Sequence, residues 1–376
     1  MTDSLTTLVA PQRTAEIHRH PHRAKSQLRG WDAADEYVLE HVAELDLGPD
    51  SRIAIVNDAF GALGVVLADH QPVDVSDSEN ARIGRSANLE RNGLTGRASR
   101  SSFDELDGEI DLLILKIPKS LGQLEDQLRR LRPFLTENTV VLGAGMTKAI
   151  HSSTLELFES LVGPTSTSLA RKKARLIHAT VDPSSDIGRN PWPRAWRYAG
   201  LDVASHGGVF SAEKIDGGTQ MLLQSMGAVD WPTRIVDLGC GNGIIGLTLA
   251  KQIPDAELVF ADESHRALRS AEESWAANYP DRTAEFLAID RLVNAVDRDS
   301  VDLIVTNPPF HSDRSMGDAV AWDMFVDAYA TLQVDGELWV VGNRHLGYHA
   351  KVKKIFGNGE VVASNTTYVV LQARRT

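Results

Sequence analysis

The chain has 376 residues, enough for two domains of ordinary size, and 42% of them are hydrophobic, enough to build full cores. Its formal net charge of -12 opposes nucleic-acid binding over the whole surface, because phosphate contacts are made by Lys and Arg. No apolar stretch approaches the roughly 20 residues that a membrane span needs, and the N-terminus lacks the pattern of a signal segment. The single cysteine, Cys240, excludes an internal disulfide framework and a cysteine-based zinc cluster. We expect a cytoplasmic protein.

Basic residues are nevertheless concentrated in four segments, at residues 11–30, 129–133, 171–175 and 351–354. Each alone is more typical of a solvated face, but four of them in an acidic chain are compatible with a local site for a polyanion. Three histidines of the first segment could be imagined as metal ligands: His18, His20 and His22. A flexible basic arm fits this segment better, because it has no helix or strand period, and we expect no metal.

A stretch rich in Pro, Ser, Asp and Gly lies near the middle of the chain, at residues 181–196. It has no apolar period, which predicts a linker. It separates an N-terminal domain, residues 1–180, from a C-terminal domain, residues 197–376.

The two halves contain similar segments in the same order. RIAIVNDAFGALGVVLA at 52–68 aligns without a gap with RIVDLGCGNGIIGLTLA at 234–250, and each predicts a buried strand, a glycine turn and the start of a helix. Further on, DLLILKIPK at 111–119 corresponds to DLIVTNPPF at 302–310. Alternating strands and helices predict a parallel sheet covered on both faces. We therefore expect an α/β protein with two tandem Rossmann-like domains from an internal duplication.

The two copies differ at the positions that carry chemistry. The second half has polar or glycine residues there: Asp237, Gly239, Gly241 and Asn307. The first half has other side chains: Ile55, Asn57, Ala59 and Lys116. We expect the N-terminal copy to be degenerate, with the fold kept and the site lost. A chance likeness of two α/β domains is the alternative.

The glycine loop is the strongest single signal. Gly241, Gly243 and Gly246 satisfy G-x-G-x-x-G, and Asp262 follows at the end of the next predicted strand, so a dinucleotide dehydrogenase must be considered. Glycines let a ligand approach the backbone closely, and the carboxylate accepts from ribose hydroxyls whether the cofactor is a dinucleotide or another nucleoside. The loop alone therefore does not establish a dinucleotide.

Two residues directly upstream, Asp237 and Gly239, extend the loop to D-x-G-x-G-x-G. A carboxylate on that turn repels a pyrophosphate, because like charges repel. It attracts a cationic or zwitterionic ligand such as the aminoacyl end of S-adenosylmethionine.

The stretch TNPPFH, residues 306–311, directly follows an apolar run that predicts a buried strand, and strand exits are where open α/β sheets place ligands. Its prolines fix the backbone and leave carbonyls unpaired. The Asn307 side-chain oxygen and the Pro308 carbonyl could accept both hydrogens of a planar NH2 group, while Phe310 stacks on its ring. A proline-marked turn explains the six residues alone equally well. Together with the glycine loop they indicate methyl transfer to a planar nitrogen.

The whole pattern resembles the class I S-adenosylmethionine-dependent methyltransferases, and within them the ribosomal RNA guanine-N2 methyltransferases of the RlmG and RsmC type. The likeness covers nearly the whole chain and is closest to the large-subunit (23S) branch. Extended runs carry it: WDAADEYVLEH at 31–41, NDAFGALG at 57–64, HSSTLELFESLVGPTSTSLARKKARLI at 151–177, WDMF at 322–325 and NRHLGYHAKVKKIFGN at 343–358. The segment HGGVFSAEKIDGGTQ at 206–220 departs from the family pattern.

The resemblance implies S-adenosylmethionine as cofactor and large-subunit ribosomal RNA as partner. The residues expected to contact the cofactor are Asp237, Gly239, Gly241, Gly243, Asp262, Asp290, Phe210 and Gly217. Those expected to hold the base are Asn307, Pro308, Pro309 and Phe310. Helix capping is an alternative role for Asp262 and Asp290, and a hairpin turn for Phe210 and Gly217. Cys240 has no base partner in sequence and is expected to be a small buried side chain.

The residues predict direct in-line transfer without a covalent intermediate. By themselves they do not separate guanine N2 from adenine N6 or a glutamine amide, since each presents an NH2 group. The alternatives are a small-subunit (16S) enzyme, a DNA adenine-N6 methyltransferase, or a protein that binds S-adenosylmethionine and RNA without turnover. The first half is expected to position RNA or to serve as a scaffold.

Overall fold

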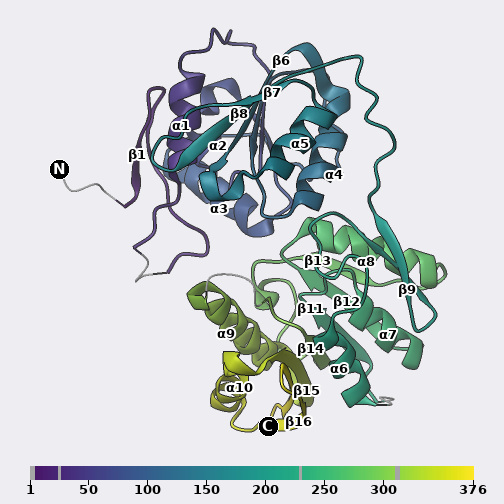
Figure 1. Cartoon of the computed structure of the whole chain (residues 1–376). Helices are drawn as coiled ribbons and strands as arrows, with labels where there is room; N and C mark the ends of the chain where they lie inside the picture. Colours follow the sequence, from purple (N-terminus) through teal and green to yellow (C-terminus); the bar gives the residue numbers. More distant parts are fainter. Residues whose placement is uncertain (1–4, 24–26, 228–230, 310–313) are drawn as a thin grey trace. The chain divides into compact units, whose positions relative to one another are not determined.

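The computed structural model describes residues 5–23, 27–227, 231–309 and 314–376, and it divides the chain into two compact units (Figure 1). The first unit is Met1–Trp192 and the second is Pro193–Thr376. The division lies within the segment for which the sequence predicts a linker. Two α/β units in tandem confirm the expected class of fold.

The described part of the first unit is built on a six-stranded sheet of order β4-β3-β5-β6-β8-β7. Its strands are β3 (Ile53–Val56), β4 (Val73–Val75), β5 (Ile110–Lys116), β6 (Leu135–Met146), β7 (Thr165–Thr167) and β8 (Ala174–Thr180). Its helices are α1 (Ala33–Val42), α2 (Ala62–Val66), α3 (Glu79–Arg91), α4 (Leu121–Leu131) and α5 (Ser152–Leu161). Two short strands, β1 (Thr7–Val9) and β2 (Thr14–Glu16), pair with each other near the N-terminus.

The second unit has a seven-stranded sheet of order β13-β12-β11-β14-β15-β17-β16 among its described residues. The strands are β11 (Arg234–Leu238), β12 (Glu257–Asp262), β13 (Glu285–Ala288), β14 (Val301–Thr306), β15 (Leu332–Asn343), β16 (Glu360–Ser364) and β17 (Tyr368–Arg374). The helices are α6 (Gly217–Met226), α7 (Ile244–Gln252), α8 (His265–Asn278), α9 (Arg314–Thr331) and α10 (Tyr348–Phe356). A separate pair, β9 (Arg194–Tyr198) and β10 (Leu201–Ser205), packs against α8.

Both sheets are mixed, so the prediction of a parallel sheet was right only in part. β17 runs antiparallel to β15 and β16, and β8 runs antiparallel to β6 and β7. The reason is the same in each unit: its last two strands form an antiparallel pair, β7 with β8 and β16 with β17. The second strand of each pair then lies beside the last parallel strand, β8 beside β6 and β17 beside β15.

The two sheets also share strand order and an irregularity of register. The order β4-β3-β5-β6-β8-β7 corresponds to β12-β11-β14-β15-β17-β16. In each sheet the register shifts near the start of one strand pair, where the strands advance unequally: Ile110 to Leu112 against Leu135 to Val140, and Val301 to Leu303 against Leu332 to Glu337. The segments that the sequence aligned therefore occupy matching places.

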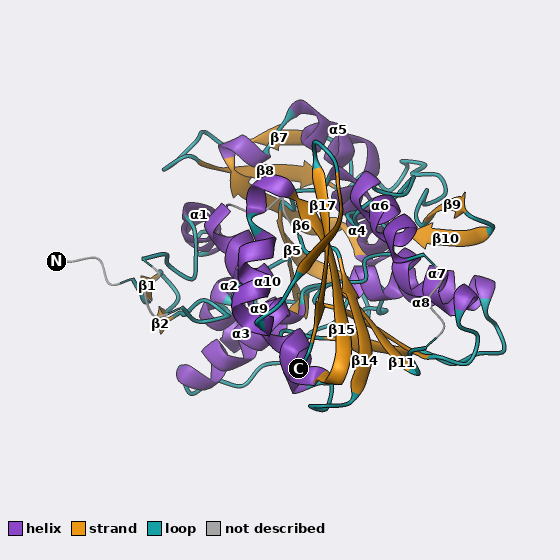
Figure 2. Ribbon diagram, turned by 90° about the horizontal axis from the view of Figure 1, so that it is seen from below, coloured by secondary structure: helices purple, strands orange, loops and turns teal. Residues whose placement is uncertain are grey.

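Alternate residues of each strand face opposite helical layers. In the second sheet, Leu303 and Val305 belong to the core beneath α6, α7 and α8, whereas Ile304 belongs to the core beneath α9 and α10. Figure 2 shows these two groups of helices on opposite sides of β11, β14 and β15. This alternation decides which polar side chains at the strand ends can meet.

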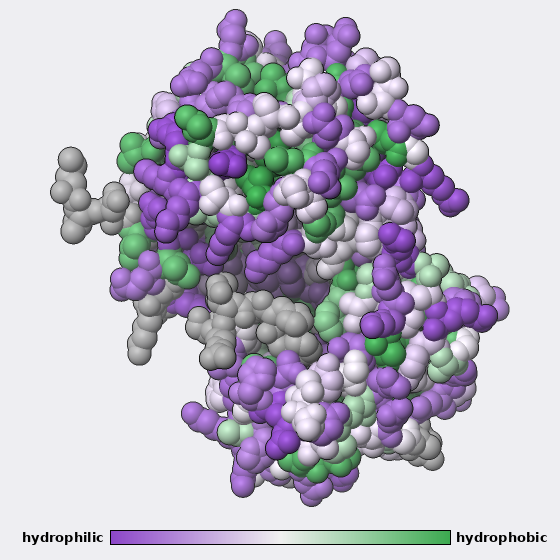
Figure 3. Space-filling view, in the orientation of Figure 1, coloured by the Kyte–Doolittle hydropathy of each residue, from purple (hydrophilic) through white to green (hydrophobic). Residues whose placement is uncertain are grey.

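Hydrophilic residues are spread widely over the visible face of each unit (Figure 3). Several basic residues of the four clusters have acidic partners: Arg13 with Asp69, Arg130 with Asp126, Arg171 with Glu40, Lys172 with Glu36, and Lys351 with Asp318. Arg129 donates to the Ile187 carbonyl and so ties the linker segment to α4. Within the described residues no helix is long and apolar enough to span a membrane.

Candidate active site

The polar positions predicted from the second half lie along one edge of the second sheet. Asp262 ends β12, Gly239 follows β11, Asn307 follows β14 and Asp290 comes shortly after β13. The order β13-β12-β11-β14 is parallel, so the carboxyl ends of these neighbouring strands lie at the same edge. Open α/β sheets bind ligands at this edge.

Three glycines of the loop adopt the left-handed backbone conformation: φ is +71° at Gly239, +57° at Gly241 and +82° at Gly243. Residues with a Cβ adopt this region rarely, so the turn requires glycine. The surroundings of the three differ. A Cβ on Gly241 would meet no atom of the described residues within 4 Å, whereas one on Gly243 would lie 3.1 Å from the Ala271 Cβ. Gly241 is therefore the position where the backbone faces open space.

Gly246 serves packing instead. A Cβ there would lie 2.3 Å from the Phe260 ring, which stacks on Phe286 and packs edge-on against Trp275. The G-x-G-x-x-G pattern thus combines a ligand-facing glycine with glycines that let α7 approach β12 closely.

Asp237 is fully buried on the face of β11 that packs against α7. Its Oδ2 accepts from the Gly246 amide at 2.9 Å, and its buried Oδ1 has no hydrogen-bond partner in the residues that the structure describes. Burial, together with repulsion from Asp262, raises the pKa of Asp237 to about 8, although the Gly246 bond opposes the shift. The Asp237 side chain thus ties the start of α7 to β11, and it places an acidic group with a raised pKa directly behind the glycine loop.

Asp262 links the glycine loop to the next helix. Its Oδ2 accepts from the Gly241 amide at 3.0 Å and its Oδ1 accepts from the Ser264 amide at 2.9 Å. The N-cap of α8 is Ser264 and not Asp262. Burial raises the pKa of Asp262, while these backbone bonds act to lower it. The carboxylate remains only partly buried at the sheet edge.

Asp290 lies beside Asp262 along the edge, because the Ile289 amide donates to the Asp262 carbonyl at 3.0 Å. Its own Oδ1 accepts from the Arg291 amide at 2.7 Å and from Asn294 Nδ2 at 2.9 Å. These bonds stabilise the short turn of helix at Leu292–Asn294. A local structural role is therefore visible beside the predicted contact with the cofactor.

Asn307 has one engaged and one free end. Its Nδ2 donates to Thr219 Oγ1 at 2.9 Å and lies 3.5 Å from Asp216 Oδ2. Its Oδ1 is buried and has no hydrogen-bond partner among the described residues. A buried amide oxygen without a donor costs free energy, about 1–3 kcal/mol by analogy with other unsatisfied groups. The predicted acceptor is thus present and available.

Sequence reasoning missed Asp216, Thr219 and Tyr368. Asp216 is the N-cap of α6, and Tyr368 Oη donates to its Oδ1 at 3.3 Å. A local signal existed for the cap, since Asp before Gly-Gly-Thr and an apolar run is typical of a helix start. No local signal indicated that the cap meets Asn307.

The other predicted residues are placed as follows. Pro308 is buried and Pro309 is exposed directly after Asn307, while Phe310 lies outside the described residues. Gly217 is the first residue of α6, and a Cβ on it would lie 3.2 Å from the Tyr368 ring. The Phe210 side chain is 44% exposed and precedes Ser211, whose carbonyl accepts from Asn242 of the glycine loop at 3.2 Å.

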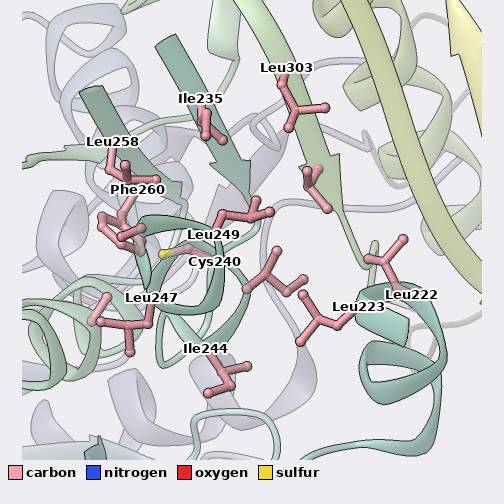
Figure 4. Packing of buried hydrophobic residues seen from close by; sticks show 14 of the residues in the cluster. Leu222, Leu223, Ile235, Cys240, Ile244, Leu247, Leu249, Leu258, Phe260 and Leu303 are labelled. Atoms are coloured by element: carbon pink, nitrogen blue, oxygen red, sulfur yellow. The ribbon is translucent and has the colours of Figure 1, made fainter. Parts of the chain in front are cut away.

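Cys240 lies inside the loop but points into the hydrophobic core beneath α7 (Figure 4). Burial and the neighbouring carboxylates of Asp262 and Asp237 raise the pKa of its thiol well above the usual value. The thiol stays protonated, so it does not act as a nucleophile. Among the residues described, no group of three or more His, Cys, Asp or Glu is arranged to hold a metal ion.

The corresponding edge of the first sheet is filled by its own side chains. Lys116 Nζ donates to Asp35 Oδ1 at 2.5 Å and to Asp32 Oδ1 at 2.9 Å. Asn57, where the second unit has Gly239, keeps a left-handed φ of +64° and donates to the Lys116 carbonyl at 3.0 Å. Burial lowers the pKa of Lys116, but attraction to the two carboxylates outweighs it and the pKa is raised. Lys116 is therefore a structural cation.

The glycine turn of the first unit is blocked as well. A Cβ on Gly61 would lie 2.7 Å from Arg85, which packs into this turn and pairs with Asp74 at 3.9 Å. Asp58 Oδ2 accepts from the Gly64 amide at 2.9 Å, the counterpart of the bond between Asp237 and Gly246. The helix start is thus held in the same manner without a glycine that faces open space.

Comparison with known proteins agrees with this geometry. Residues 5–183 match the family model described as the RLMG N-terminal domain, and residues 200–372 match the methyltransferase small domain. Curated proteins named ribosomal RNA large subunit methyltransferase G are 47% identical in Streptomyces coelicolor (95% of this chain, 97% of that protein), 43% in Aeromonas hydrophila (95% and 96%) and 39% in Pseudomonas putida (98% and 99%).

The solved structure of a T. thermophilus 16S rRNA N2 methyltransferase, RsmC, in complex with AdoMet and guanosine is 22% identical, with a TM-score of 0.76 over 99% of this chain and 98% of that one. This likeness shows that the whole fold is shared. The resemblance inferred from the sequence is confirmed, and S-adenosylmethionine is the cofactor of this fold and family. The chain belongs to the ribosomal RNA large subunit methyltransferase G family.

Proposed function

We propose that this protein transfers the methyl group of S-adenosylmethionine to the exocyclic N2 of a specific guanine in 23S ribosomal RNA. The observation that carries the proposal is the buried Oδ1 of Asn307, which has no hydrogen-bond partner within the described part of the chain and lies at the sheet edge that also holds the open glycine turn. The curated relatives, which are named for the large subunit and match nearly the whole chain, support the choice of RNA.

The residues present fit a cationic cofactor. Asp237 and Asp262 place two carboxyl groups with raised pKa values behind and beside the loop, where a positive ligand would offset their cost. Gly241 leaves space for a ligand against the backbone. A pyrophosphate would add negative charge to this edge, which disfavours the dehydrogenase alternative.

We assign the cofactor contacts along the edge in strand order. Gly239, Gly241 and Gly243 would admit the methionine portion, Asp262 would accept from the ribose hydroxyls, and Asp290 would face the adenine. Asp237 would affect the cofactor through the loop, because its hydrogen bond with the Gly246 amide directs the carboxylate toward α7 and away from direct contact with the cofactor. Phe210 and Gly217 would border the same site. Bound S-adenosylmethionine supplies an electrophilic methyl group on a positively charged sulfur.

The target amine would donate to Asn307 Oδ1 and to the Pro308 carbonyl, with Pro309 holding the turn and Phe310 stacking on the base. Two acceptors favour a more pyramidal nitrogen, which frees the lone pair that the ring otherwise delocalises. In such a transfer the N2 nitrogen would form the new N–C bond as the C–S bond breaks, and its proton would leave for water. A base in a helix must be extruded to reach such a pocket.

The first unit is proposed to position RNA or to act as a scaffold, and to descend from a duplication of the second. The matching strand order and the matching register shift support a common origin. Lys116 and Asn57 stand where the second unit has Asn307 and Gly239. Arg85 packs against the glycine turn of the first unit, and together these side chains support the loss of the first site. A cytoplasmic location agrees with the one cysteine being free and buried.

The experiment is methyl transfer from labelled S-adenosylmethionine to deproteinised large- and small-subunit ribosomal RNA, followed by nucleoside analysis, with Asn307→Ala alongside. We expect N2-methylguanosine in the large-subunit RNA and a loss of about 10²- to 10³-fold in the variant, the usual effect of removing one stabilising contact of the transition state. Label in the small-subunit RNA alone, on adenosine, or on neither RNA despite cofactor binding would contradict the proposal.

A further inference from the structure

The Asn307 amide is held from a distant part of the sequence. Its two partners belong to the first turn of α6: Asp216 is the N-cap and Thr219 is the third residue of the helix, buried to 4% exposure. Some 88 residues separate Thr219 from Asn307. Neither partner lies in the glycine loop or in the turn that would hold the base.

These two partners determine which end of the amide faces the site. An ionised carboxylate only accepts hydrogen bonds, so the NH2 end of Asn307 must face Asp216 Oδ2 at 3.5 Å. The same end donates to Thr219 Oγ1 at 2.9 Å. Turning the amide over would bring two oxygens together and leave a buried NH2 group without an acceptor. The free oxygen is therefore directed away from α6.

Asp216 accepts hydrogen bonds from four donors. Its Oδ2 accepts from the amides of Gly218 and Thr219 at 2.8 and 3.1 Å, in addition to Asn307. Its Oδ1 accepts from Tyr368 Oη at 3.3 Å. These four donors fix the position of the carboxylate, as suits a group that orients a neighbour.

The first unit repeats this contact with different chemistry. Lys116 occupies the place in the first sheet that corresponds to Asn307 in the second. Its Nζ donates to Asp32 and Asp35, the N-cap and third residue of α1. The contact between strand end and helix cap is thus kept in both units. In the second unit the strand end contributes a neutral amide instead, whose oxygen has no hydrogen-bond partner among the described residues.

We propose that Asp216 and Thr219 are positioning residues for methyl transfer, which fix the Asn307 amide so that its Oδ1 faces the target amine. The inference rests on the proposed function, because it assigns these residues to the same site. It predicts that loss of the Thr219 hydroxyl slows transfer without weakening cofactor binding.

The test compares Thr219→Val with wild type, with Thr219→Ser as the conservative variant. We expect kcat with large-subunit ribosomal RNA to fall about tenfold in Thr219→Val, the effect of one lost hydrogen bond of ordinary strength, while the KM for S-adenosylmethionine is unchanged. Thr219→Ser should restore most of kcat. The matched control is Thr248→Val, which removes another helical hydroxyl, one that donates to the Ile244 carbonyl, and should leave kcat unchanged.

A double-mutant cycle separates positioning from general damage. If Thr219 acts through Asn307, then Thr219→Val combined with Asn307→Ala is no slower than Asn307→Ala alone. Additive losses, a raised KM for S-adenosylmethionine, or no rescue by Thr219→Ser would overturn the inference.

A second measurement does not depend on turnover. The side-chain NH2 signal of Asn307 in an NMR spectrum, assigned by its absence in Asn307→Ala, should exchange slowly with solvent in wild type and Thr219→Ser and faster in Thr219→Val. Equal exchange in wild type and Thr219→Val would overturn the positioning role. Wild type that methylates no RNA would instead overturn the proposed function, and the amide signal would still decide whether Thr219 holds Asn307.

Discussion

Lys116 and Asn307 occupy the same place in their two sheets. Lys116 follows Leu115, which pairs with Val56, and Asn307 follows Thr306, which pairs with Leu238. Each then reaches the cap of the helix that precedes its first strand. One position thus carries an ion pair in the first unit and a free amide oxygen in the second, and this difference separates a structural contact from a candidate site.

Removing the cation should destabilise the first unit alone. Lys116→Met leaves Asp35, whose side chain is 9% exposed, beside Asp32 without a counter-charge. We expect the free energy of unfolding to fall by about 3–5 kcal/mol, the usual cost of breaking a buried pair by removing one partner. Urea denaturation followed by circular dichroism measures this change as a lower urea concentration at the midpoint of the transition that reports the first unit.

The control for this change is Lys119→Met, since Lys119 is exposed shortly after the end of β5 and should shift stability by less than about 0.5 kcal/mol. Affinity for S-adenosylmethionine should not change in either variant. An unaltered first transition in Lys116→Met would show that the ion pair contributes nothing to the fold.

The place of Asn307 at a strand end could be predicted because it depends on local features, an apolar run followed by two prolines. The same holds for the glycine turn and the alternation of strands and helices. The contact of Asn307 with Thr219 could not be predicted, because it follows from sheet order and from the packing of α6 against β15 and β17. No pattern within one segment encodes it.

The direction of Asp237 is a second case. The sequence interpretation places Asp237 on the glycine turn, but the residue lies within β11. Its side chain shares the face of Ile235, toward α7, and so binds Gly246. Strand parity relative to the helical layers decides this, and it requires the three-dimensional fold. The antiparallel end of each sheet was missed for a related reason. The sequence of two short strands joined by a turn does not indicate which other strand of the sheet they pair with.

Two glycines of the G-x-G-x-x-G pattern should respond differently to alanine, one chiefly in stability and the other chiefly in cofactor affinity. At Gly246 the added Cβ would overlap the Phe260 ring, so Gly246→Ala should lower stability by about 1–3 kcal/mol, as overpacking does. At Gly241 the Cβ enters open space, so stability should fall only by the cost of a left-handed alanine, about 1 kcal/mol, while affinity for S-adenosylmethionine falls about tenfold or more.

Thermal unfolding and calorimetric titration of S-adenosylmethionine distinguish these two effects. Cofactor affinity that is lost equally in both variants, after correction for unfolded protein, would show that Gly241 is a packing glycine like Gly246.

The thiol of Cys240 should be unreactive in the folded protein. It is buried, and its raised pKa keeps it protonated at neutral pH. We expect iodoacetamide at about pH 8 to alkylate the urea-unfolded chain readily and the folded chain very slowly. Mass spectrometry after timed quenching measures this, and Cys240→Ala should retain methyl transfer. Rapid alkylation of the folded protein with loss of activity would place the thiol in the site.

Asp237 should make both stability and cofactor binding depend on pH. Its pKa is raised from 3.8 in the unfolded chain to about 8 in the folded protein, chiefly by burial. Between these values the folded protein holds a proton that the unfolded chain has released. Stability from this group is therefore complete below the unfolded pKa and is lost as pH rises through the folded pKa. In Asp237→Asn the loss should disappear, while the amide oxygen still accepts from Gly246.

Cofactor binding should change with pH in the opposite sense. A cation near the loop favours the ionised carboxylate, so binding lowers the pKa of Asp237 and affinity for S-adenosylmethionine rises from about pH 6 to about pH 9. Asp262, whose pKa is also raised, is present in both proteins, so the difference between the wild-type and Asp237→Asn curves isolates Asp237. Calorimetric titrations across this range give the two curves. Parallel curves would mean that Asp237 remains protonated with the cofactor bound, and that its contribution is limited to holding the start of α7.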